Sequence, residues 1–313
     1  MIDLRHGDCL ELIKSIPSNS VDLVCADMPY GTTRCKWDTL IDLDALWPEL
    51  KRVTKERAAI VLFAQTPFDK VLGASNLPML RYEWIWEKNT STGHLNAKKM
   101  PMKAHENVLV FYKKLPVYNA QKTTGHKRKV AIRSQDNSDC YGKQDKLTRY
   151  DSTERYPRSV QKFDSDRYKE NLHPTQKPVS LLEYIIKTYS NEEDVVLDFC
   201  MGSGTAGVAA KSLRRSFIGF EKERKYFDIA SARIGEIESP EGSNSIHHTS
   251  KGAYFTHKIR TEKTEQIVMK AIHELRLANK RVSKAAVARE CGVSREQISK
   301  RYSYLFEVAN AAS

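Results

Sequence analysis

Four consecutive residues, Asp27, Met28, Pro29 and Tyr30, directly follow an apolar run, Val21 to Ala26. An exocyclic amino group on a flat ring carries two N–H donors and therefore needs two acceptors. The Asp27 carboxylate and the Met28 backbone carbonyl can supply them. Pro29 stiffens the turn, and Tyr30 offers a ring face on which a base can stack. The four are candidate catalytic residues, because an amine held this way presents its lone pair to an electrophile.

A second apolar run, Val195 to Phe199, opens into a glycine-rich turn, Gly202 to Gly204, and then a helical stretch from Thr205. This order lets backbone approach a ligand closely at the positive end of a helix. The next strand-like run ends in Glu221, 23 residues after Asp198, where a carboxylate can accept hydrogen bonds from two ribose hydroxyls. Alone, the spacing fits NAD and S-adenosylmethionine equally.

Strand-like and helical runs alternate along the first 236 residues and predict an α/β, doubly wound Rossmann-like sheet with crossover helices. Strands are expected at 2–4, 21–26, 58–63, 82–86, 108–112, 195–199 and 216–220, and helices at 10–16, 43–54, 178–189, 205–213 and 226–234. Asp27 and Gly202 then follow neighbouring strands and face one cleft. Periodicity fades from 113 to 171, which predicts a long functional loop.

Positive charge is concentrated in two segments. Residues 111–170 hold 15 Lys and Arg against 8 Asp and Glu, and residues 258–302 hold 12 against 5. The remainder holds 24 against 26. Basic segments on a near-neutral body indicate a polyanionic partner, because Lys and Arg contacts to phosphates release counterions. We therefore expect nucleic acid, with a generally basic protein as the alternative.

Several segments, in the same order, resemble the amino-methylating DNA methyltransferases of the β-class, whose target-amine motif precedes the cofactor loop, and especially prophage-type members. The resemblance covers roughly residues 1–236. Besides the two runs above, the segments that carry it are His6 to Glu11, Tyr82 to Lys88, His105 to Tyr112 and His173-Pro174-Thr175-Gln176-Lys177-Pro178. Met28 departs from the family pattern, which has a second Pro there, and is compatible with it if that position acts through its carbonyl.

The resemblance implies S-adenosyl-L-methionine as cofactor and methylation of a base amino group in DNA after base flipping. It implies that Asp8 contacts the cofactor's adenine, that Thr175 and Lys177 lie near its methionine end, and that Glu221 holds the ribose. The expected cofactor-binding residues are Asp8, Cys9, Thr175, Lys177, Asp198, Phe199, Gly202, Ser203, Gly204, Thr205 and Glu221. Asp at position 27 favours adenine N6 over cytosine N4, for which Ser is commoner in the family.

DNA contacts are expected from two places. Residues 113–172, inside a catalytic domain of residues 1–236, occupy the place of a target-recognition insertion. After a linker at 237–260, residues 261–313 resemble a helix-turn-helix module, with Gly292 at the turn and Ser294 as a helix cap. The candidate DNA-binding residues are Lys127, Arg128, Lys129, Arg149, Arg155, Arg158, Arg295, Gln297 and Lys300.

Three alternatives remain: a cytosine-N4 DNA or RNA methyltransferase, a DNA-binding regulator with an inactive methyltransferase fold, and an NAD dehydrogenase. The dehydrogenase gives no role to Asp27 through Tyr30 or to the basic segments. Scattered cysteines and the absence of a long apolar run predict a cytoplasmic protein without metal or membrane span. The family resemblance adds a homodimer as an expectation.

Overall fold

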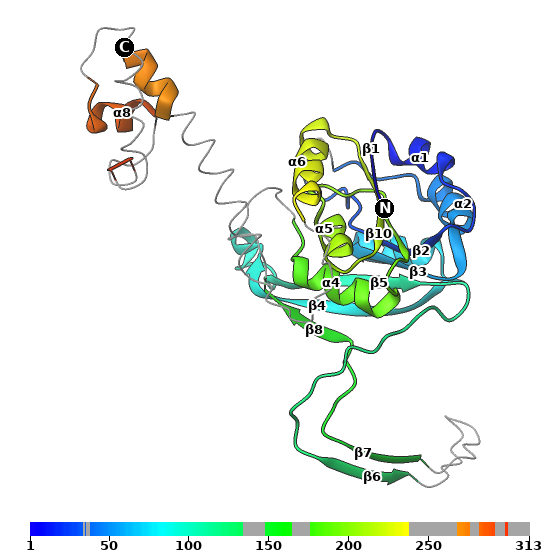
Figure 1. Ribbon diagram of the computed structural model, residues 1–313. Helices are drawn as coiled ribbons and strands as arrows, with labels where there is room; N and C mark the ends of the chain where they lie inside the picture. Colours follow the sequence, from blue (N-terminus) through cyan, green and yellow to red (C-terminus); the bar gives the residue numbers. More distant parts are fainter. Residues whose placement is uncertain are drawn as a thin grey trace. The chain divides into compact units, whose positions relative to one another are not determined.

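The computed structural model describes residues 1–33, 35, 38–133, 148–164, 176–237, 268–275, 282–291 and 298–299. Contacts divide the chain into two compact units, Met1–Ser243 and Asn244–Ser313, whose elements are labelled in Figure 1. In the described residues no helix is long and apolar enough to cross a membrane.

The first unit is built on an eight-stranded sheet in the order β1-β10-β9-β2-β3-β5-β4-β8. Its strands are β1 (Ile2–His6), β2 (Val21–Ala26), β3 (Thr54–Ala64), β4 (Leu80–Thr92), β5 (Lys103–Phe111), β8 (Val160–Phe163), β9 (Val195–Asp198) and β10 (Ser216–Glu221). Pairing is parallel from β1 through β3, whereas β5 runs antiparallel to both of its neighbours. The sheet is therefore mixed, and its parallel part places the ends of β2 and β9 side by side.

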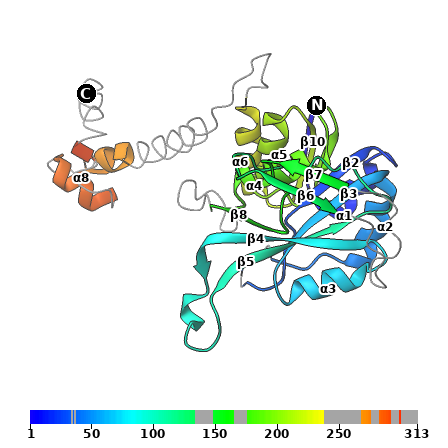
Figure 2. The ribbon, with the colours of Figure 1, turned by 90° about the horizontal axis from the view of Figure 1, so that it is seen from below.

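Helices cover both faces of this sheet (Figures 1 and 2). Short helical turns and two helices pack on one face: α1 (Cys9–Leu12), η1 (Ile13–Ser15), α2 (Leu43–Val53) and α3 (Phe68–Ser75). The other face carries α4 (Val179–Tyr189), α5 (Thr205–Ser212) and α6 (Arg224–Gly235). Strand β2 alternates between the two cores, with Leu23 and Cys25 facing α4 and Val24 and Ala26 facing α2. The predicted doubly wound fold is confirmed.

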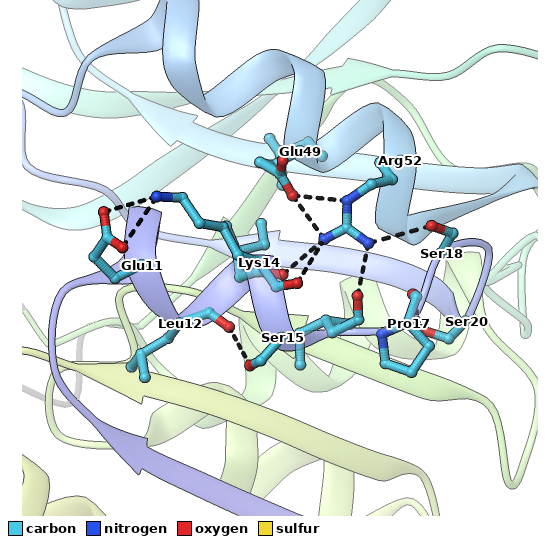
Figure 3. Close-up of polar contacts among 12 residues, drawn as sticks. Glu11, Leu12, Lys14, Ser15, Pro17, Ser18, Ser20, Glu49 and Arg52 are labelled. Atoms are coloured by element: carbon cyan, nitrogen blue, oxygen red, sulfur yellow. Dashed lines mark hydrogen bonds and ion pairs between the residues drawn. The ribbon is translucent and has the colours of Figure 1, made fainter.

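The chain reaches β2 through a turn that Arg52 of α2 fixes from outside (Figure 3). Its guanidinium donates to the carbonyls of Ile13 and Ile16 at 2.9 and 2.7 Å, and it pairs with Glu49 one turn earlier. These carbonyls lie at the end of the helical turn, where the Ile13 carbonyl also accepts from Ile16 N at 3.0 Å. Arg52 thus anchors the segment that leads into β2, the strand that ends just before Asp27.

The expectation of a long loop at 113–171 was wrong in part. Strands β6 (Lys129–Arg133) and β7 (Thr148–Ser152) form an antiparallel ribbon of their own, and β8 joins the main sheet beside β4. The ribbon is exposed on one face at Val130, Ile132 and Arg149. Val130 and Ile132 do alternate in β6, but that strand is only five residues long and its partner β7 is mostly polar, so the sequence gives no clear strand signal. Helix α3 was likewise not predicted.

In the second unit, residues 268–275 are helical and α8 spans Lys284–Cys291. They share a small core that includes Val268, Ile272, Val287 and Ile298. Arg295, Gln297 and Lys300, which were predicted for this module, lie outside the described residues, as do Thr175 and most of the predicted linker.

Candidate functional site

A cleft of about 1020 Å³ opens at the ends of the parallel strands. The segments that line it follow four of these strands: Gly7–Cys9 after β1, Asp27–Tyr30 after β2, Asp198–Ser203 at the end of β9, and Glu221 at the end of β10. The four candidate catalytic residues all line this cleft. So do the predicted cofactor residues that the structure describes, apart from Gly204: Asp8, Cys9, Lys177, Asp198, Phe199, Gly202, Ser203, Thr205 and Glu221.

Three carboxyl groups at one end of the cleft are held by backbone N–H groups. Glu221 accepts from Gly202 N at 2.9 Å through one oxygen and from Glu223 N at 2.8 Å through the other. Asp198 accepts from Cys200 N at 3.0 Å, and Asp8 accepts from Leu10 N at 3.0 Å as the N-cap of α1. Each carboxyl is oriented by backbone before any ligand arrives.

Two positions of the glycine-rich turn favour glycine. Gly202 and Gly204 have φ of 52° and 79°, in the left-handed region that favours glycine. A Cβ on Gly204 would lie 2.9 Å from the Cβ of Ala230 in α6. The buried Arg233 donates to the Ser203 carbonyl at 2.6 Å. The turn therefore packs tightly against α6 and keeps its shape.

Burial raises the pKa of Asp198 to about 8, the Cys200 N–H opposes the rise, and the charges of Asp27 and Glu221 add to it. At neutral pH, which is below this pKa, the Asp198 carboxyl is mostly protonated. A cation bound beside it would favour loss of that proton. The amide of Gln176 also lines the cleft, is 8% exposed, and has no hydrogen-bond partner among the described residues. Together with the Glu221 carboxylate, these groups fit a cofactor that combines ribose hydroxyls with positive charge.

At the other end of the cleft, charged side chains hold one another. Asp27 accepts from Tyr30 Oη at 2.6 Å through one oxygen and from Lys177 Nζ at 2.5 Å through the other. Lys177 also reaches Glu106 at 3.1 Å, and Lys88 pairs with the second oxygen of Glu106. The result is an alternating chain, Asp27–Lys177–Glu106–Lys88, in which two carboxylates and two ammonium groups share a largely buried space.

The pKa shifts follow from this alternation. Burial raises the pKa of Asp27, and Lys177 opposes part of the rise. Burial also disfavours the charged form of Glu106, but Lys177 and Lys88 outweigh it and lower its pKa. Burial disfavours the charged form of Lys177 as well, and the two carboxylates outweigh it and raise its pKa. Lys177 also lies over the Tyr30 and Phe63 rings, at 5.7 and 5.2 Å.

Sequence reasoning did not identify Glu106 or Lys88 as site residues, although both belong to segments that carried the family resemblance. It placed Lys177 near the cofactor's methionine end; the structure places its ammonium on Asp27, in the cleft that the predicted cofactor residues also line. Strands β4 and β5 both mix charged and apolar residues. Neither sequence indicates which charged side chain faces the cleft. The signal is three-dimensional, since Asp27 and Lys177 are 150 residues apart.

The predicted DNA-binding residues of the insertion fall into two groups. Those exposed at the surface are Lys127, Arg128, Lys129, Arg149 and Arg158, of which Arg128 pairs with Asp151 at 2.7 Å. Arg155 instead donates to the carbonyls of Lys127, Ser152 and Glu154. Its guanidinium therefore braces the ribbon, a role that differs from the one predicted for it.

Comparison with known proteins agrees with this geometry. A family model described as DNA methylase matches residues 21–232. The chain is 31% identical over 252 residues to the DNA adenine methyltransferase YhdJ of Escherichia coli K12, covering 73% of this chain and 81% of that one. It is 29% identical over 273 residues to the Type II methyltransferase M.HinfI of Haemophilus influenzae, covering 75% and 68%.

Solved structures share the fold. The M1.HpyAVI–SAM complex superposes with a TM-score of 0.52 at 25% identity, covering 75% of this chain and 99% of that one. The cytosine-N4-specific PvuII DNA methyltransferase superposes with a TM-score of 0.56 at 17% identity, covering 82% and 91%. At that identity the second match speaks for the fold alone.

Proposed function

Because the chain belongs to the DNA methylases that modify adenine N6 or cytosine N4, we propose that it methylates the N6 amino group of adenine in DNA. S-adenosylmethionine is the cofactor. The observation that carries the proposal is the adjacency of β2 and β9, since it brings Asp27 and the glycine-rich turn to one cleft. Segments some 170 residues apart in the sequence thus line one cleft, which supports a shared active site.

The cofactor end of the cleft can be assigned residue by residue. The Glu221 carboxylate would accept hydrogen bonds from ribose hydroxyls, and Asp198 would face positive charge. The glycine-rich turn would let backbone N–H groups at the start of α5 lie against the ligand. When bound, S-adenosylmethionine supplies an electrophilic methyl group.

The target end holds the amine. The Asp27 carboxylate and the Met28 carbonyl accept hydrogen bonds from its two N–H groups, which leaves the nitrogen lone pair directed into the cleft. Met28 as a whole is 2% exposed and packs in the core beside α2, although it lines the cleft, so we assign this contact to its carbonyl and not to its side chain. Phe68 stacks on the Tyr30 ring at 5.7 Å and fixes it. The methylated amine sheds its extra proton easily, so Asp27 need not be a strong base.

Adenine in a duplex is stacked and paired, so the reaction requires the base to be flipped out. The exposed basic residues of the β6–β7 ribbon would supply phosphate contacts that position the enzyme on DNA. We further propose that residues 261–313 add a helix-turn-helix contact, with the linker before them. Adenine over cytosine rests on Asp at position 27 and on the named activity of the E. coli relative.

The test is to incubate unmethylated DNA, and separately RNA, with isotopically labelled cofactor and to identify labelled nucleosides by mass spectrometry. We expect N6-methyladenine from DNA. Label in N4-methylcytosine would overturn the base assignment, and label in RNA alone would overturn the substrate. Absence of any label while the cofactor still binds would favour a DNA-binding protein with an inactive fold.

A further inference from the structure

Strands β4 and β5 continue past the body of the sheet as a hairpin, which Figure 2 shows. Its tip is a short 3-10 turn, η2 (His94–Asn96), preceded by Gly93 with φ of 90°. Asn96 N donates to the Gly93 carbonyl at 2.9 Å, and Lys99 N donates to the Asn96 carbonyl at 2.8 Å. The tip is therefore a hydrogen-bonded structure that can hold a side chain in a defined place.

Apolar side chains on this hairpin face water. Leu95 at the tip is 86% exposed, and Met100 and Met102 on the returning arm are 53% and 41% exposed. Large exposed apolar side chains on an ordered hairpin indicate a surface that binds a partner.

The hairpin borders the cleft. Residues Thr90 through His94 line the same cavity as Asp27, and so do Trp86 and Lys88 further back on β4. A strand rises about 3.3 Å per residue, so the four steps from Lys88 to Thr92 carry the hairpin at most about 13 Å outward. That reach is comparable to the width of the DNA major groove, about 12 Å.

The charge of the hairpin identifies the partner. Beyond Lys88, which pairs with Glu106 in the cleft, positions 89 to 105 hold three lysines and two histidines and no aspartate or glutamate. Apolar side chains flanked by lysines suit DNA, where the phosphates meet the ammonium groups and the stacked bases meet the apolar groups.

Base flipping leaves a gap in the stack, and inserted Leu, Met or Phe side chains are a known means of occupying such a gap. We propose that Leu95 is the wedge that enters the duplex beside the target nucleotide while the flipped base occupies the cleft. The inference rests on the proposed function and adds to it the element that performs the flipping. Lys98 and Lys99 would contact the flanking phosphates.

The test compares two oligonucleotide duplexes that contain the methylated sequence once it has been identified. In one the target adenine is paired with thymine, and in the other it faces an abasic site, so that flipping costs less. The Leu95→Ala variant should methylate the paired duplex about tenfold or more slowly than the wild type, because the unstacking cost is no longer offset. On the abasic duplex its rate should approach that of the wild type.

Two variants serve as controls. Leu77→Ala removes a leucine that is 63% exposed and lies outside the cleft, and it should behave as the wild type on both duplexes. Leu95→Met keeps an apolar wedge and should retain most of the rate on the paired duplex. If Leu95→Ala is equally slow on both duplexes, or unaffected on both, the wedge assignment is overturned. If the wild type methylates neither, the proposed function itself fails.

Discussion

The two ends of the cleft hold their carboxyl groups by different means. At the cofactor end, Asp198 and Glu221 are oriented by backbone N–H groups no more than 19 residues away. At the target end, Asp27 and Glu106 are oriented by Lys177 and Lys88 from other elements. The first arrangement uses backbone of the loops at the ends of neighbouring strands β9 and β10, whereas the second uses side chains from several different elements.

The difference predicts different sensitivity to substitution. Backbone N–H groups survive most side-chain changes, so the cofactor end should respond mainly to backbone strain. The target end depends on individual ammonium groups, and removing one partner of a buried pair leaves an uncompensated charge. Mutations in the two ends should therefore separate into effects on cofactor affinity and effects on the methyl-transfer rate.

The largest effect of breaking the charge chain is expected from Lys177→Met. The change leaves Asp27 and Glu106 facing each other, so their pKa values rise and the acid limb of the kcat profile moves to higher pH. Loss of a buried partner costs about 3–5 kcal/mol in unfolding free energy, and we expect kcat to fall about 1000-fold. Rapid-quench kinetics and denaturant unfolding measure these two quantities.

Lys14→Met is the matched control for that variant, because Lys14 pairs with Glu11 on the surface with both side chains more than half exposed (Figure 3). Exposed pairs contribute about 0–1 kcal/mol. Equal loss of stability in the two variants would contradict the distinction between the two kinds of pair.

Glu106→Gln should have the next largest effect. The substitution keeps the shape but removes the charge between Lys88 and Lys177, so Lys177 binds Asp27 more tightly and competes with the target amine. We expect kcat to fall by about 10- to 100-fold, within the usual range for a misplaced catalytic group. Calorimetry should find the cofactor dissociation constant unchanged, and a parallel loss of cofactor affinity would place Glu106 at the wrong end of the cleft.

A smaller effect is expected from Gly204→Ala at the cofactor end. The added Cβ meets Ala230 at 2.9 Å, and φ is 79°. Overpacking and strain together cost about 1–3 kcal/mol. We expect a lower melting temperature and weaker cofactor binding, with kcat at saturating cofactor little changed.

Gly125→Ala isolates the backbone contribution, because Gly125 has φ of 78° and nothing within 4 Å of its Cβ position. The Gly125→Ala variant should lose less unfolding free energy than the Gly204→Ala variant and should bind the cofactor normally. Identical behaviour of the two variants would show that the contact with α6 is unimportant.

The smallest effect is a pH dependence of cofactor binding. The pKa of Asp198 is about 8 in the free protein, and a cationic ligand binds the ionised carboxylate better than the neutral acid. Affinity should therefore increase with pH, by up to about tenfold per unit, and level off above pH 8. Titration calorimetry from pH 6 to 9 covers both sides of the pKa of about 8. It should detect a proton released when the cofactor binds, and Asp198→Asn should abolish that release.

The same comparison explains what the sequence could predict. Apolar runs followed by glycine or by Asp-Met-Pro-Tyr located β2, β9 and the cofactor end, because those signals are local. The pairing of β2 with β9 followed from the rule for open α/β sheets. Glu106 and Lys88 were missed, because contacts between distant strands leave no periodic pattern in the sequence. The β6–β7 ribbon was missed because both strands are short and β7 is mostly polar.

The central claim is that Asp27 acts on the target amine while Glu221 serves the cofactor in the same cleft. Measurement of both the methyl-transfer rate at saturating cofactor and the cofactor dissociation constant for Asp27→Ala and Glu221→Ala tests it most directly. We predict that Asp27→Ala abolishes methylation with near-normal cofactor binding, and that Glu221→Ala weakens cofactor binding while retaining methylation at saturation. Full activity of Asp27→Ala would contradict the assignment.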